Sequence, residues 1–393
     1  MRIGIDARFF GPAGKGLGRY TQKLVENIEK IYIQEKEVHG QDVDFFIFLR
    51  QENFAEYVPQ HKRVYKVLAD CQWYTFKEQL EMPILLRKYD LDLVHFPHFN
   101  VPILYGRKFV VTIHDLILIH FPTLRGTTLN PLIYWLKFAA YKFTIAWAIW
   151  RAEKIITVSN FTRNDILANY RVEAEKIQVI YEASDDYCNI ANRKDADVLK
   201  QYGLETDNYG IIKPYILYVG NAYPHKNLER LIRAFSRLNI AMDAPNLMLV
   251  GKADYFYDNL KKIVAKEGIR NVIFAGFVPD CDLDTIYKNA TAYVFPSLYE
   301  GFGIPPLEAM AKGVPVASAN HECMQEILGE SAAYFDATDE ADIEKVIRAL
   351  VQDKSWQEKL ITAGYQQSKK YSWERMARET LEIYNKILGV NGK

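Results

Sequence analysis

Short apolar runs alternate with longer amphipathic stretches along the whole chain. This alternation predicts βαβ units, in which buried parallel strands are joined by helices. In the first half, the predicted strands cover residues 3–5, 45–48, 64–68, 93–95, 109–113, 155–158 and 177–180. The same rhythm restarts in the second half, with strands at 215–219, 246–250, 272–275, 292–295, 314–317 and 332–335. The pattern therefore predicts an α/β protein with two parallel sheets.

The stretches between the strands have helical periodicity, and they are clearest at residues 19–31, 133–151, 228–235, 283–289 and 373–388. Residues 187–213 are polar and charged without a strand pattern, so we interpret them as the linker between two domains. We expect doubly wound domains at 1–190 and 191–372, followed by a C-terminal helix within 373–393. Ligands of such sheets bind outside the carboxyl ends of the strands.

Composition agrees with two globular domains: the chain has 393 residues, of which 49% are hydrophobic and 25% charged. Basic and acidic residues both number 49, so net charge gives no indication of a nucleic-acid partner. The first residues enter a strand directly, and no apolar run is long enough to span a membrane, so we expect a cytoplasmic protein. The cysteines are widely spaced, which predicts buried thiols rather than a disulfide framework or a metal site.

The most informative stretch is FPSLYEGFGIPPLEAMAKG, residues 295–313. It follows a predicted strand and enters a helix after a loop made by Gly301, Phe302 and Gly303. Glycines before a helix N-terminus present backbone N–H groups and a positive dipole end to an anion. Glu300 and Glu308 flank this loop, and carboxylates accept hydrogen bonds from hydroxyl groups. A phosphate site between two hydroxyl acceptors predicts a sugar nucleotide as ligand.

The string Glu300-GFGIPPL-Glu308 resembles the E-x7-E signature of retaining GT-B glycosyltransferases of glycosyltransferase family 4. The resemblance implies that Glu300 holds hydroxyls of the donor sugar and takes part in catalysis. It also implies that Glu308 holds the ribose hydroxyls and that the loop 301–303 holds the diphosphate. The alternative is an ordinary strand–loop–helix unit with surface glutamates.

A second glycine-rich segment, residues 11–20, follows the first predicted strand. It matches neither G-x-G-x-x-G nor a Walker A loop. It resembles the G-[IL]-G-R-Y loop of the same family, which implies that the backbone of Gly16 to Gly18 contacts the donor diphosphate across a cleft between the domains. The alternative is a flexible loop without a ligand.

Two further strand ends carry candidate catalytic residues. The run 111–113 ends in His114 and Asp115. In the family, the matching histidine lines the donor sugar, so we expect His114 to be catalytic. Asp115 either orients the imidazole, as part of an acceptor-side site, or caps the next segment. In the segment 218–228, a lysine near a helix N-terminus is unfavourable unless it meets an anion.

The family places an arginine and a lysine at the positions of Asn221 and Lys226, where both neutralise the leaving diphosphate. This chain keeps Lys226, which we expect to be catalytic and donor-binding. Asn221 departs from the pattern, and we expect it to bind a donor phosphate or hydroxyl through a hydrogen bond.

Three weaker motifs complete the candidates. Phe277 follows the strand at 272–275, where the resemblance implies a loop that reads the nucleobase; a simple turn is the alternative. Residues 279–284 contain D-x-D twice, but they precede a predicted helix, so we interpret the acids as N-caps and as first-turn charges stabilised by the helix dipole, and we predict no metal. His98 and Asn100 either face the acceptor or form a packed aromatic turn.

The helix at residues 130–151 is rich in tryptophan, tyrosine and phenylalanine, with interspersed lysines. This composition suits a membrane interface, and it also suits a core helix of the first domain. Both interpretations apply if different parts of the helix have different surroundings.

The family matches run in order from the N-terminus to near Tyr384 and imply the GT-B fold, with the last helix crossing back to the N-terminal domain. They imply transfer of a hexose, mannose or rhamnose, from a GDP-, UDP- or dTDP-sugar to a glycan or lipid-linked acceptor in cell-surface polysaccharide synthesis. Donor would bind the C-terminal domain and acceptor the N-terminal one, without a cofactor. One alternative is a sugar-nucleotide epimerase. Another is a catalytically weak nucleotide-sugar-binding protein, which is consistent with Asn221 at the position of the family's arginine. A third is an oxidoreductase, which the missing G-x-G-x-x-G motif disfavours.

Overall fold

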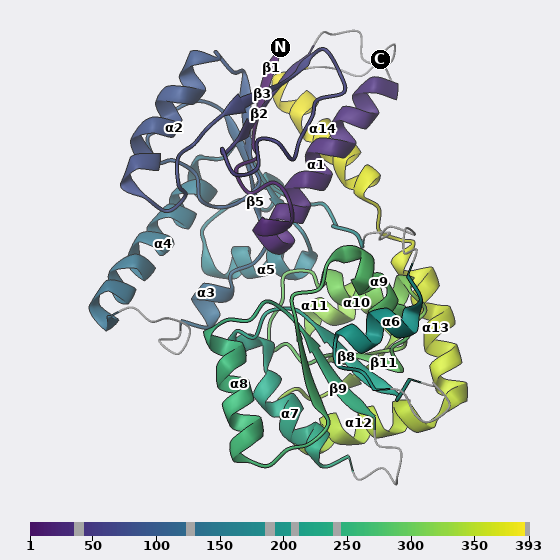
Figure 1. The fold of residues 1–393 in the computed structure, drawn as a ribbon. Helices are drawn as coiled ribbons and strands as arrows, with labels where there is room; N and C mark the ends of the chain where they lie inside the picture. The colour runs from purple at the N-terminus through teal and green to yellow at the C-terminus, as the bar shows by residue number, and fades with distance from the viewer. Residues whose placement is uncertain (35–42, 123–129, 185–192, 206–211, 239–244, 390–393) are drawn as a thin grey trace. The chain divides into compact units, whose positions relative to one another are not determined.

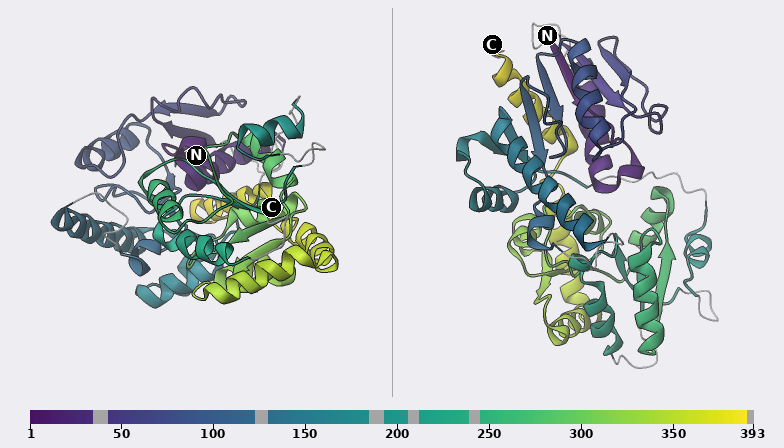
Figure 2. Two further views of the ribbon diagram at one scale, coloured as in Figure 1. Left: turned by 60° about the horizontal axis from the view of Figure 1, so that its bottom comes forward. Right: turned by 90° about the vertical axis from the view of Figure 1, so that its left-hand side faces the viewer.

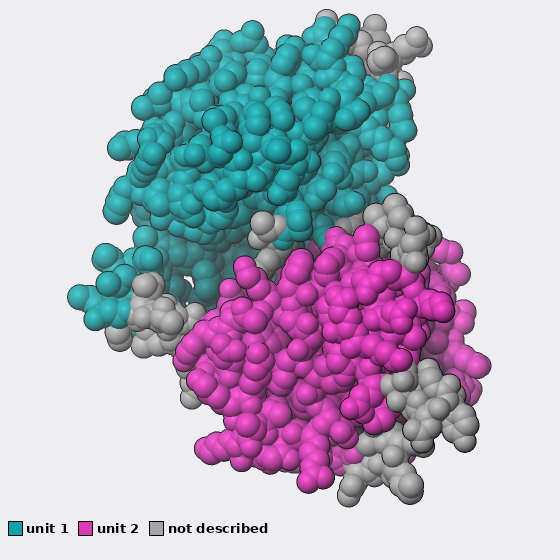
Figure 3. Space-filling model, viewed as in Figure 1, with its two compact units in different colours: residues 1–122, 129–182, 372–393 teal, residues 123–128, 183–371 magenta. Residues whose placement is uncertain are grey.

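The computed structural model describes residues 1–34, 43–122, 130–184, 193–205, 212–238 and 245–389. The chain divides into two compact units (Figure 3). Unit 1 consists of Met1–Pro122, Leu129–Glu182 and Ser372–Lys393, and unit 2 consists of Thr123–Thr128 and Ala183–Tyr371. The chain therefore returns to unit 1 for its last helix. Each unit is described separately below.

Unit 1 is built on a parallel sheet of seven strands in the order β3-β2-β1-β4-β5-β6-β7 (Figure 1). The strands are β1 (Arg2–Asp6), β2 (Asp44–Leu49), β3 (Val64–Leu68), β4 (Leu93–Phe96), β5 (Phe109–Ile113), β6 (Lys154–Thr157) and β7 (Ile177–Val179). In register, Ile3 pairs with Phe45 on one side and with Leu93 on the other. The strand order reverses between β1 and β4, which is where doubly wound sheets bind their ligands.

The helices of unit 1 cover both faces of this sheet (Figures 1 and 2). They are α1 (Lys15–Gln34), α2 (Phe76–Lys88), α3 (Ile117–His120), α4 (Pro131–Arg151), α5 (Asn160–Asn169) and α14 (Trp373–Leu388), with 3-10 turns η1 (Pro12–Gly14) and η3 (Ala174–Lys176). Met82 of α2 and Ile149 of α4 share a core with Val94 and Val111. Because side chains alternate along a strand, His95 and Thr112 point to the opposite face, where α1 packs against α14.

Unit 2 is built on a second parallel sheet, with six strands in the order β10-β9-β8-β11-β12-β13. These strands are β8 (Tyr215–Val219), β9 (Asn246–Val250), β10 (Val272–Gly276), β11 (Ala292–Phe295), β12 (Val316–Ala319) and β13 (Ala332–Phe335). The order reverses between β8 and β11, so this sheet has its own binding edge. The helices are α6 (Asp195–Gln201), α7 (Leu228–Ser236), α8 (Tyr255–Lys266), α9 (Asp280–Lys288), α10 (Ile304–Ala311), α11 (Glu322–Leu328), α12 (Glu340–Gln352) and α13 (Lys354–Ser368), with 3-10 turns η4 (Pro224–Lys226) and η5 (Gly329–Ser331).

Every strand that the apolar runs predicted is present in the described chain, with small shifts at the ends. The largest shift is in β12, which begins at Val316 rather than at residue 314. Pro315 explains it, because proline has no N–H group to donate within a sheet. The last helix covers Trp373–Leu388 as predicted, and the Ser372 side chain caps it by accepting from the Arg375 N–H group.

Three expectations about local structure were wrong. Gly16 and Gly18 lie in the first turn of α1 rather than in a loop, because the helix begins at Lys15. The predicted linker contains α6, whose buried Val198 and Leu199 give it an apolar face, and α6 packs against α9. Cys281 is exposed, whereas Cys71 and Cys323 are buried as expected. Cys188 lies outside the described residues.

The acidic residues at 280–284 have one of their two expected roles. Helix α9 begins at Asp280, so Asp280 and Asp282 lie in its first turn, where they interact favourably with the helix dipole. They do not cap the helix, since Pro279 occupies the cap position without a side-chain hydrogen bond. Among the residues that the structure describes, no helix is long and apolar enough to cross a membrane.

Candidate functional site

The predicted site residues gather at the carboxyl edges of the two sheets, next to the points where the strand order reverses. In unit 1, the segment before α1 follows β1, the segment with His98 and Asn100 follows β4, and His114 follows β5. In unit 2, the segment with Asn221 and Lys226 follows β8, and the loop from Glu300 to Gly303 follows β11. Each sheet therefore presents its candidate residues at the edge where ligands of this architecture bind.

In unit 2, Lys226 and Glu300 form an ion pair. The Lys226 Nζ donates to Glu300 Oε1 at 2.6 Å, and the two side chains are only 14% and 9% exposed. Burial favours the neutral carboxyl group, but the adjacent Lys226 charge outweighs it, so the pKa of Glu300 is lowered. The Glu300 carboxyl group is therefore ionised at neutral pH. The two residues that the sequence assigned to separate parts of the donor are bonded to each other.

Two buried imidazoles lie near this ion pair. Burial and the Lys226 charge lower the pKa of His225 to about 4. Burial also lowers the pKa of His321. Both rings are therefore neutral at pH 7, and Lys226 supplies the positive charge of this group of four side chains.

The backbone around Lys226 is fixed by its neighbour Asn227. Asn227 has a φ of +61° at the start of α7, and its side-chain amide donates to the carbonyl oxygens of Pro296 and Ala337 at 3.1 and 2.7 Å. Pro296 follows β11, so this amide ties the segment after β8 to the segment after β11. The tie holds Lys226 and Glu300 on adjoining loops.

The N-terminus of α10 is shaped by Gly303. Its φ of +94° suits glycine, and a Cβ there would lie 2.7 Å from the Met324 Cε atom. No side chain caps α10 within the described residues. Pro305 and Pro306 have no N–H groups, so this first turn offers fewer donors to an anion than an ordinary helix N-terminus.

Glu308 lies in the second turn of α10 and is 4% exposed. Its Oε2 accepts a hydrogen bond from the Tyr287 hydroxyl at 3.0 Å. Asn221 stabilises its own loop, because its Oδ1 accepts from the Tyr223 N–H group at 3.3 Å. Phe277 follows β10 with 68% of its surface exposed.

In unit 1, both ring nitrogens of His114 face acceptors. Nδ1 lies 2.9 Å from Glu182 Oε1, and Nε2 lies 2.9 Å from the Pro97 carbonyl oxygen. A carboxylate and a carbonyl oxygen are both acceptors, so this pair of partners favours a ring with a proton on each nitrogen, the imidazolium. Burial opposes this charge, but the hydrogen bond and charge of Glu182 outweigh it and raise the pKa of His114.

Glu182, rather than Asp115, orients the His114 ring. Asp115 Oδ1 accepts from the Ile117 N–H group at 2.9 Å, which caps the following segment. Sequence reasoning missed Glu182, which lies 68 residues beyond His114 in the chain. Its signal was a carboxylate just after the predicted strand at 177–180, at the same edge of the sheet as His114.

A buried chain of hydrogen bonds lies beneath His114 and includes the last helix. The Tyr384 hydroxyl of α14 pairs with His95 Nδ1 at 2.5 Å, and His95 Nε2 pairs with Thr112 Oγ1 at 2.8 Å. Thr112 Oγ1 in turn pairs with the Tyr20 hydroxyl of α1 at 3.1 Å, and the Tyr20 ring packs edge-on against His114. Burial and the His114 charge lower the pKa of His95 to about 3, so this ring is neutral.

The two glycines at the start of α1 have different surroundings. A Cβ on Gly18 would lie 2.1 Å from the Gly11 carbonyl oxygen and 2.6 Å from that of Phe9. Gly18 is therefore required by the packing of the chain itself. A Cβ on Gly16 would meet no described atom within 4 Å, so Gly16 is the position at which the backbone is open to a ligand.

Asn100 is one of four buried polar residues that sequence reasoning did not connect. Its side-chain amide donates to both oxygens of Glu78 at 2.8 and 2.9 Å. Glu78 also accepts from Arg8, which forms a two-pronged ion pair with Asp6. The signal for Glu78 was the pattern Thr75-x-x-Glu78, since Thr75 caps α2 by accepting from the Glu78 N–H group. The Asn100 side chain is thus engaged inside unit 1, while His98 packs between aromatic rings.

Comparisons with known proteins agree with this arrangement. Residues 16–186 match the family Glycosyltransferase Family 4, and residues 210–367 match Glycosyl transferases group 1. The chain is 28% identical to O-antigen chain mannosyltransferase B of Escherichia coli, over 94% of this chain and 95% of that protein. It is 30% identical to O-antigen chain mannosyltransferase RfbU of Salmonella typhimurium, over 72% of each.

Solved structures share the fold over the full length. Sucrose-phosphate synthase from Thermosynechococcus elongatus superposes with a TM-score of 0.75 at 18% identity, covering 100% of both chains. Anabaena Alr3699/HepE, solved in complex with UDP-glucose, superposes with a TM-score of 0.67 at 15% identity, covering 98% of this chain and 99% of that one. With two sheets of doubly wound order, matches to both family halves and a relative at 30% identity, the chain belongs to glycosyltransferase family 4 and is a glycosyltransferase of the GT-B type.

Proposed function

We propose that this enzyme transfers mannose, with retention of anomeric configuration, from a nucleotide-sugar donor to the glycan of a growing cell-surface polysaccharide. Two relatives named O-antigen mannosyltransferases support the sugar and the pathway. The complex of HepE with UDP-glucose supports a nucleotide-sugar donor. The observation that carries the proposal is the ion pair of Lys226 and Glu300 at the carboxyl edge of unit 2.

Donor binding would replace the ion pair by two better-matched interactions. A donor phosphate forms an ion pair with the Lys226 ammonium group, and a sugar hydroxyl donates a hydrogen bond to the Glu300 carboxylate. Neither charge has to be stripped of water at that step, because both are already largely buried. As the glycosidic bond to the diphosphate breaks, negative charge grows on the leaving group, and the preorganised Lys226 stabilises it.

The remaining roles in this proposal are those that the family resemblance implies, and they are given for each unit by itself. Glu308 accepts from the ribose hydroxyls, and the loop of Gly301, Phe302 and Gly303 contacts the diphosphate. Phe277 lies beside the nucleobase, and Asn221 binds a phosphate or hydroxyl. In unit 1, the open backbone at Gly16 contacts the diphosphate, and the His114 imidazolium lies at the donor sugar.

The outer face of α4 supports membrane contact on the cytoplasmic side, where a lipid-linked acceptor would be met. The inner face of the helix is in the core, through Ile145, Ala148 and Ile149. The outer face exposes large apolar side chains, namely Leu132, Trp135, Leu136, Phe143 and Trp150. The helix contains lysine and arginine but no acidic residue, which suits an anionic lipid surface.

A donor panel tests the proposed function. First, the melting temperature of the protein is measured with GDP-, UDP- and dTDP-sugars. Each donor that raises it is then incubated with the protein and a mannose-containing acceptor, and the mass of the product is recorded. We expect stabilisation by GDP-mannose and an acceptor heavier by one hexose. Isomerised donor without transfer would identify an epimerase instead, and stabilisation without any product would identify a binding protein.

A further inference from the structure

Tyr74, just before α2, has a strained backbone and an exposed side chain. Its φ of +62° lies in the left-handed region, which a bulky aromatic residue rarely adopts. The other described non-glycine residues with positive φ are aspartate or asparagine, which tolerate this conformation better. Tyr74 is 57% exposed, so burial of its ring does not offset the strain. Strain of this kind tends to persist at functional positions.

A buried charged network holds Tyr74 in this conformation. The Tyr74 N–H group donates to Glu78 Oε2 at 2.8 Å. Glu78 is fixed in turn by Asn100 and by Arg8, whose Nη2 lies 2.6 Å from Glu78 Oε1. Arg8 is bound to Asp6, and these four residues are at most 6% exposed. Residues from the ends of β1 and β4 thus fix the position of one exposed ring.

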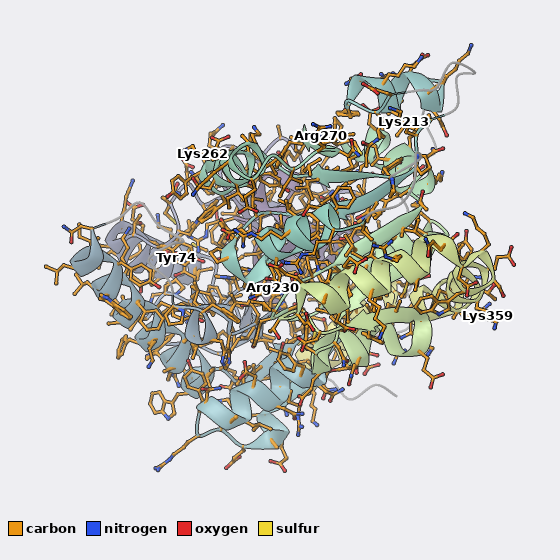
Figure 4. All side chains as sticks on the ribbon, turned by 90° about the horizontal axis from the view of Figure 1, so that it is seen from below. Tyr74, Lys213, Arg230, Lys262, Arg270 and Lys359 are labelled. Atoms are coloured by element: carbon orange, nitrogen blue, oxygen red, sulfur yellow. The ribbon has the colours of Figure 1, made fainter. Side chains whose placement is uncertain are left out.

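The Tyr74 ring belongs to a group of rings at the carboxyl edge of unit 1, which we call the aromatic platform: Phe9, Trp73, Tyr74 and His98. Phe9 packs against Trp73 with ring centroids 4.4 Å apart and against His98 at 5.3 Å. Tyr74 meets His98 edge-on at 6.0 Å. These residues follow β1, β3 and β4, so the platform lies beside the point where the strand order reverses (Tyr74 is labelled in Figure 4).

The polar atoms of the aromatic platform are defined by one hydrogen bond. His98 Nδ1 accepts from the Asn100 N–H group at 3.3 Å, so the proton of this neutral ring is on Nε2. Nε2 lies 3.4 Å from the Tyr74 hydroxyl. The platform therefore presents one exposed ring, that of Tyr74, whose hydroxyl lies next to the half-buried His98 ring, while Phe9 is buried beneath them. The network below it contains two carboxylates and one guanidinium, and the Arg50 guanidinium over the Trp73 ring is itself paired with Glu52, so these groups offer no surplus positive charge to an anion.

We propose that the aromatic platform binds a neutral pyranose ring of the acceptor glycan, with the C–H face of the sugar on Tyr74. The sugar hydroxyls meet the Tyr74 hydroxyl and His98 Nε2. An aromatic surface with few convergent polar groups is the usual chemistry of such a subsite. The inference rests on the proposed function and specifies where its acceptor binds.

The replacement Tyr74→Gly separates binding from folding. Glycine adopts positive φ without strain, so the variant loses the ring while its melting temperature stays the same or rises. We expect its acceptor KM to rise at least about tenfold while the donor KM is unchanged. Tyr74→Phe keeps the ring and most of the acceptor affinity. Tyr65→Ala removes an exposed tyrosine of β3 in the same unit and is the matched control, with an unchanged acceptor KM.

Saturation-transfer NMR can detect the binding of methyl α-mannobioside at disaccharide concentrations on the order of 10 mM, and this measurement needs no turnover. We expect a signal with the wild type and its loss in Tyr74→Gly. If the wild type transfers mannose and Tyr74→Gly keeps its acceptor KM, the platform inference is wrong and the proposed function stands. If the wild type transfers nothing, the proposed function is wrong. The platform inference is also wrong if the disaccharide binds neither protein, or if it binds the wild type and Tyr74→Gly equally well.

Discussion

Replacing Glu182 by glutamine removes one charge from the pair with His114 and almost nothing else. Glutamine has the size of glutamate, and its amide can turn to donate to His114 Nδ1 while Nε2–H still donates to the Pro97 carbonyl oxygen. Without the carboxylate, burial remains the largest influence on His114 and lowers its pKa, while the Pro97 carbonyl oxygen and the Asp115 charge still favour the charged ring to a smaller degree. We therefore expect His114 to be neutral at pH 7 in Glu182→Gln and charged in the wild type.

The magnitude follows from the geometry of the pair. The bond from Nδ1 to Oε1 is 2.9 Å long, and the two side chains are 18% and 6% exposed. A hydrogen bond between charged groups with this little exposure contributes about 1.5–3 kcal/mol to stability. The pKa of His114 is raised on folding, so this stabilisation is complete below the unfolded value of about 6.5 and is lost as pH rises through the folded value.

Unfolding experiments at about pH 6 and about pH 9 test this reasoning. We expect Glu182→Gln to be less stable than the wild type at the lower pH and the difference to shrink at the higher pH. Nitrogen NMR of the His114 ring reports its protonation directly. Asp165→Asn is the matched control, because it removes a carboxylate from His120 in the same unit; the two side chains of this pair are 35% and 9% exposed, so it is nearer to solvent than the pair of His114 and should contribute less. An equal loss of stability at both pH values, or a His114 ring still charged in the variant at pH 7, would refute the argument.

Four further variants address the donor site and the glycines at the start of α1. Lys226→Ala should lower kcat at least about tenfold, which is about 1.4 kcal/mol in barrier height, and wild-type kinetics with saturating donor would exclude a leaving-group role. Glu308→Ala should weaken donor binding measured by calorimetry, while an unchanged nucleotide affinity would count against a ribose contact. Gly18→Ala should destabilise the protein by about 1–3 kcal/mol, since its Cβ would lie 2.1 Å from the Gly11 carbonyl oxygen, whereas Gly16→Ala should keep the wild-type melting temperature. Equal melting temperatures for the two glycine variants would contradict the packing argument.

The strands and most helices were predictable because their signals are local. A buried parallel strand is a short apolar run, and a helix start such as Ser372 before Trp373 is a pattern of adjacent residues. The errors at α1 and α6 have different causes. Glycine has a low helix propensity, so Gly16 and Gly18 concealed the start of α1 at Lys15. Helix α6 depends on a distant partner, because it packs against α9 and buries Val198 and Leu199.

The partners of the site residues were not predictable in the same way. The motif around Glu300 indicated a carboxylate for a sugar hydroxyl, but not that Lys226, 74 positions earlier, would be its ion-pair partner in this structure. His114 was a candidate by its place at a strand end, while its charge depends on Glu182, 68 positions later. Asn100 was expected to face the acceptor or to belong to a packed aromatic turn, and the sequence did not indicate that its amide would bind Glu78, which accepts from the Tyr74 N–H group.

By itself the sequence determined the α/β class, the two doubly wound sheets and the family, because these follow from hydrophobic period and from motifs of adjacent residues. Only the tertiary structure decided which charges meet, which glycine is open to a ligand, and which aromatic ring is held in a strained conformation at the surface. The physical reason is that protonation, ion pairing and backbone strain depend on distances between side chains from different strands. In a parallel sheet these distances are set by the order of the strands, and residues far apart in the chain then become neighbours at one edge.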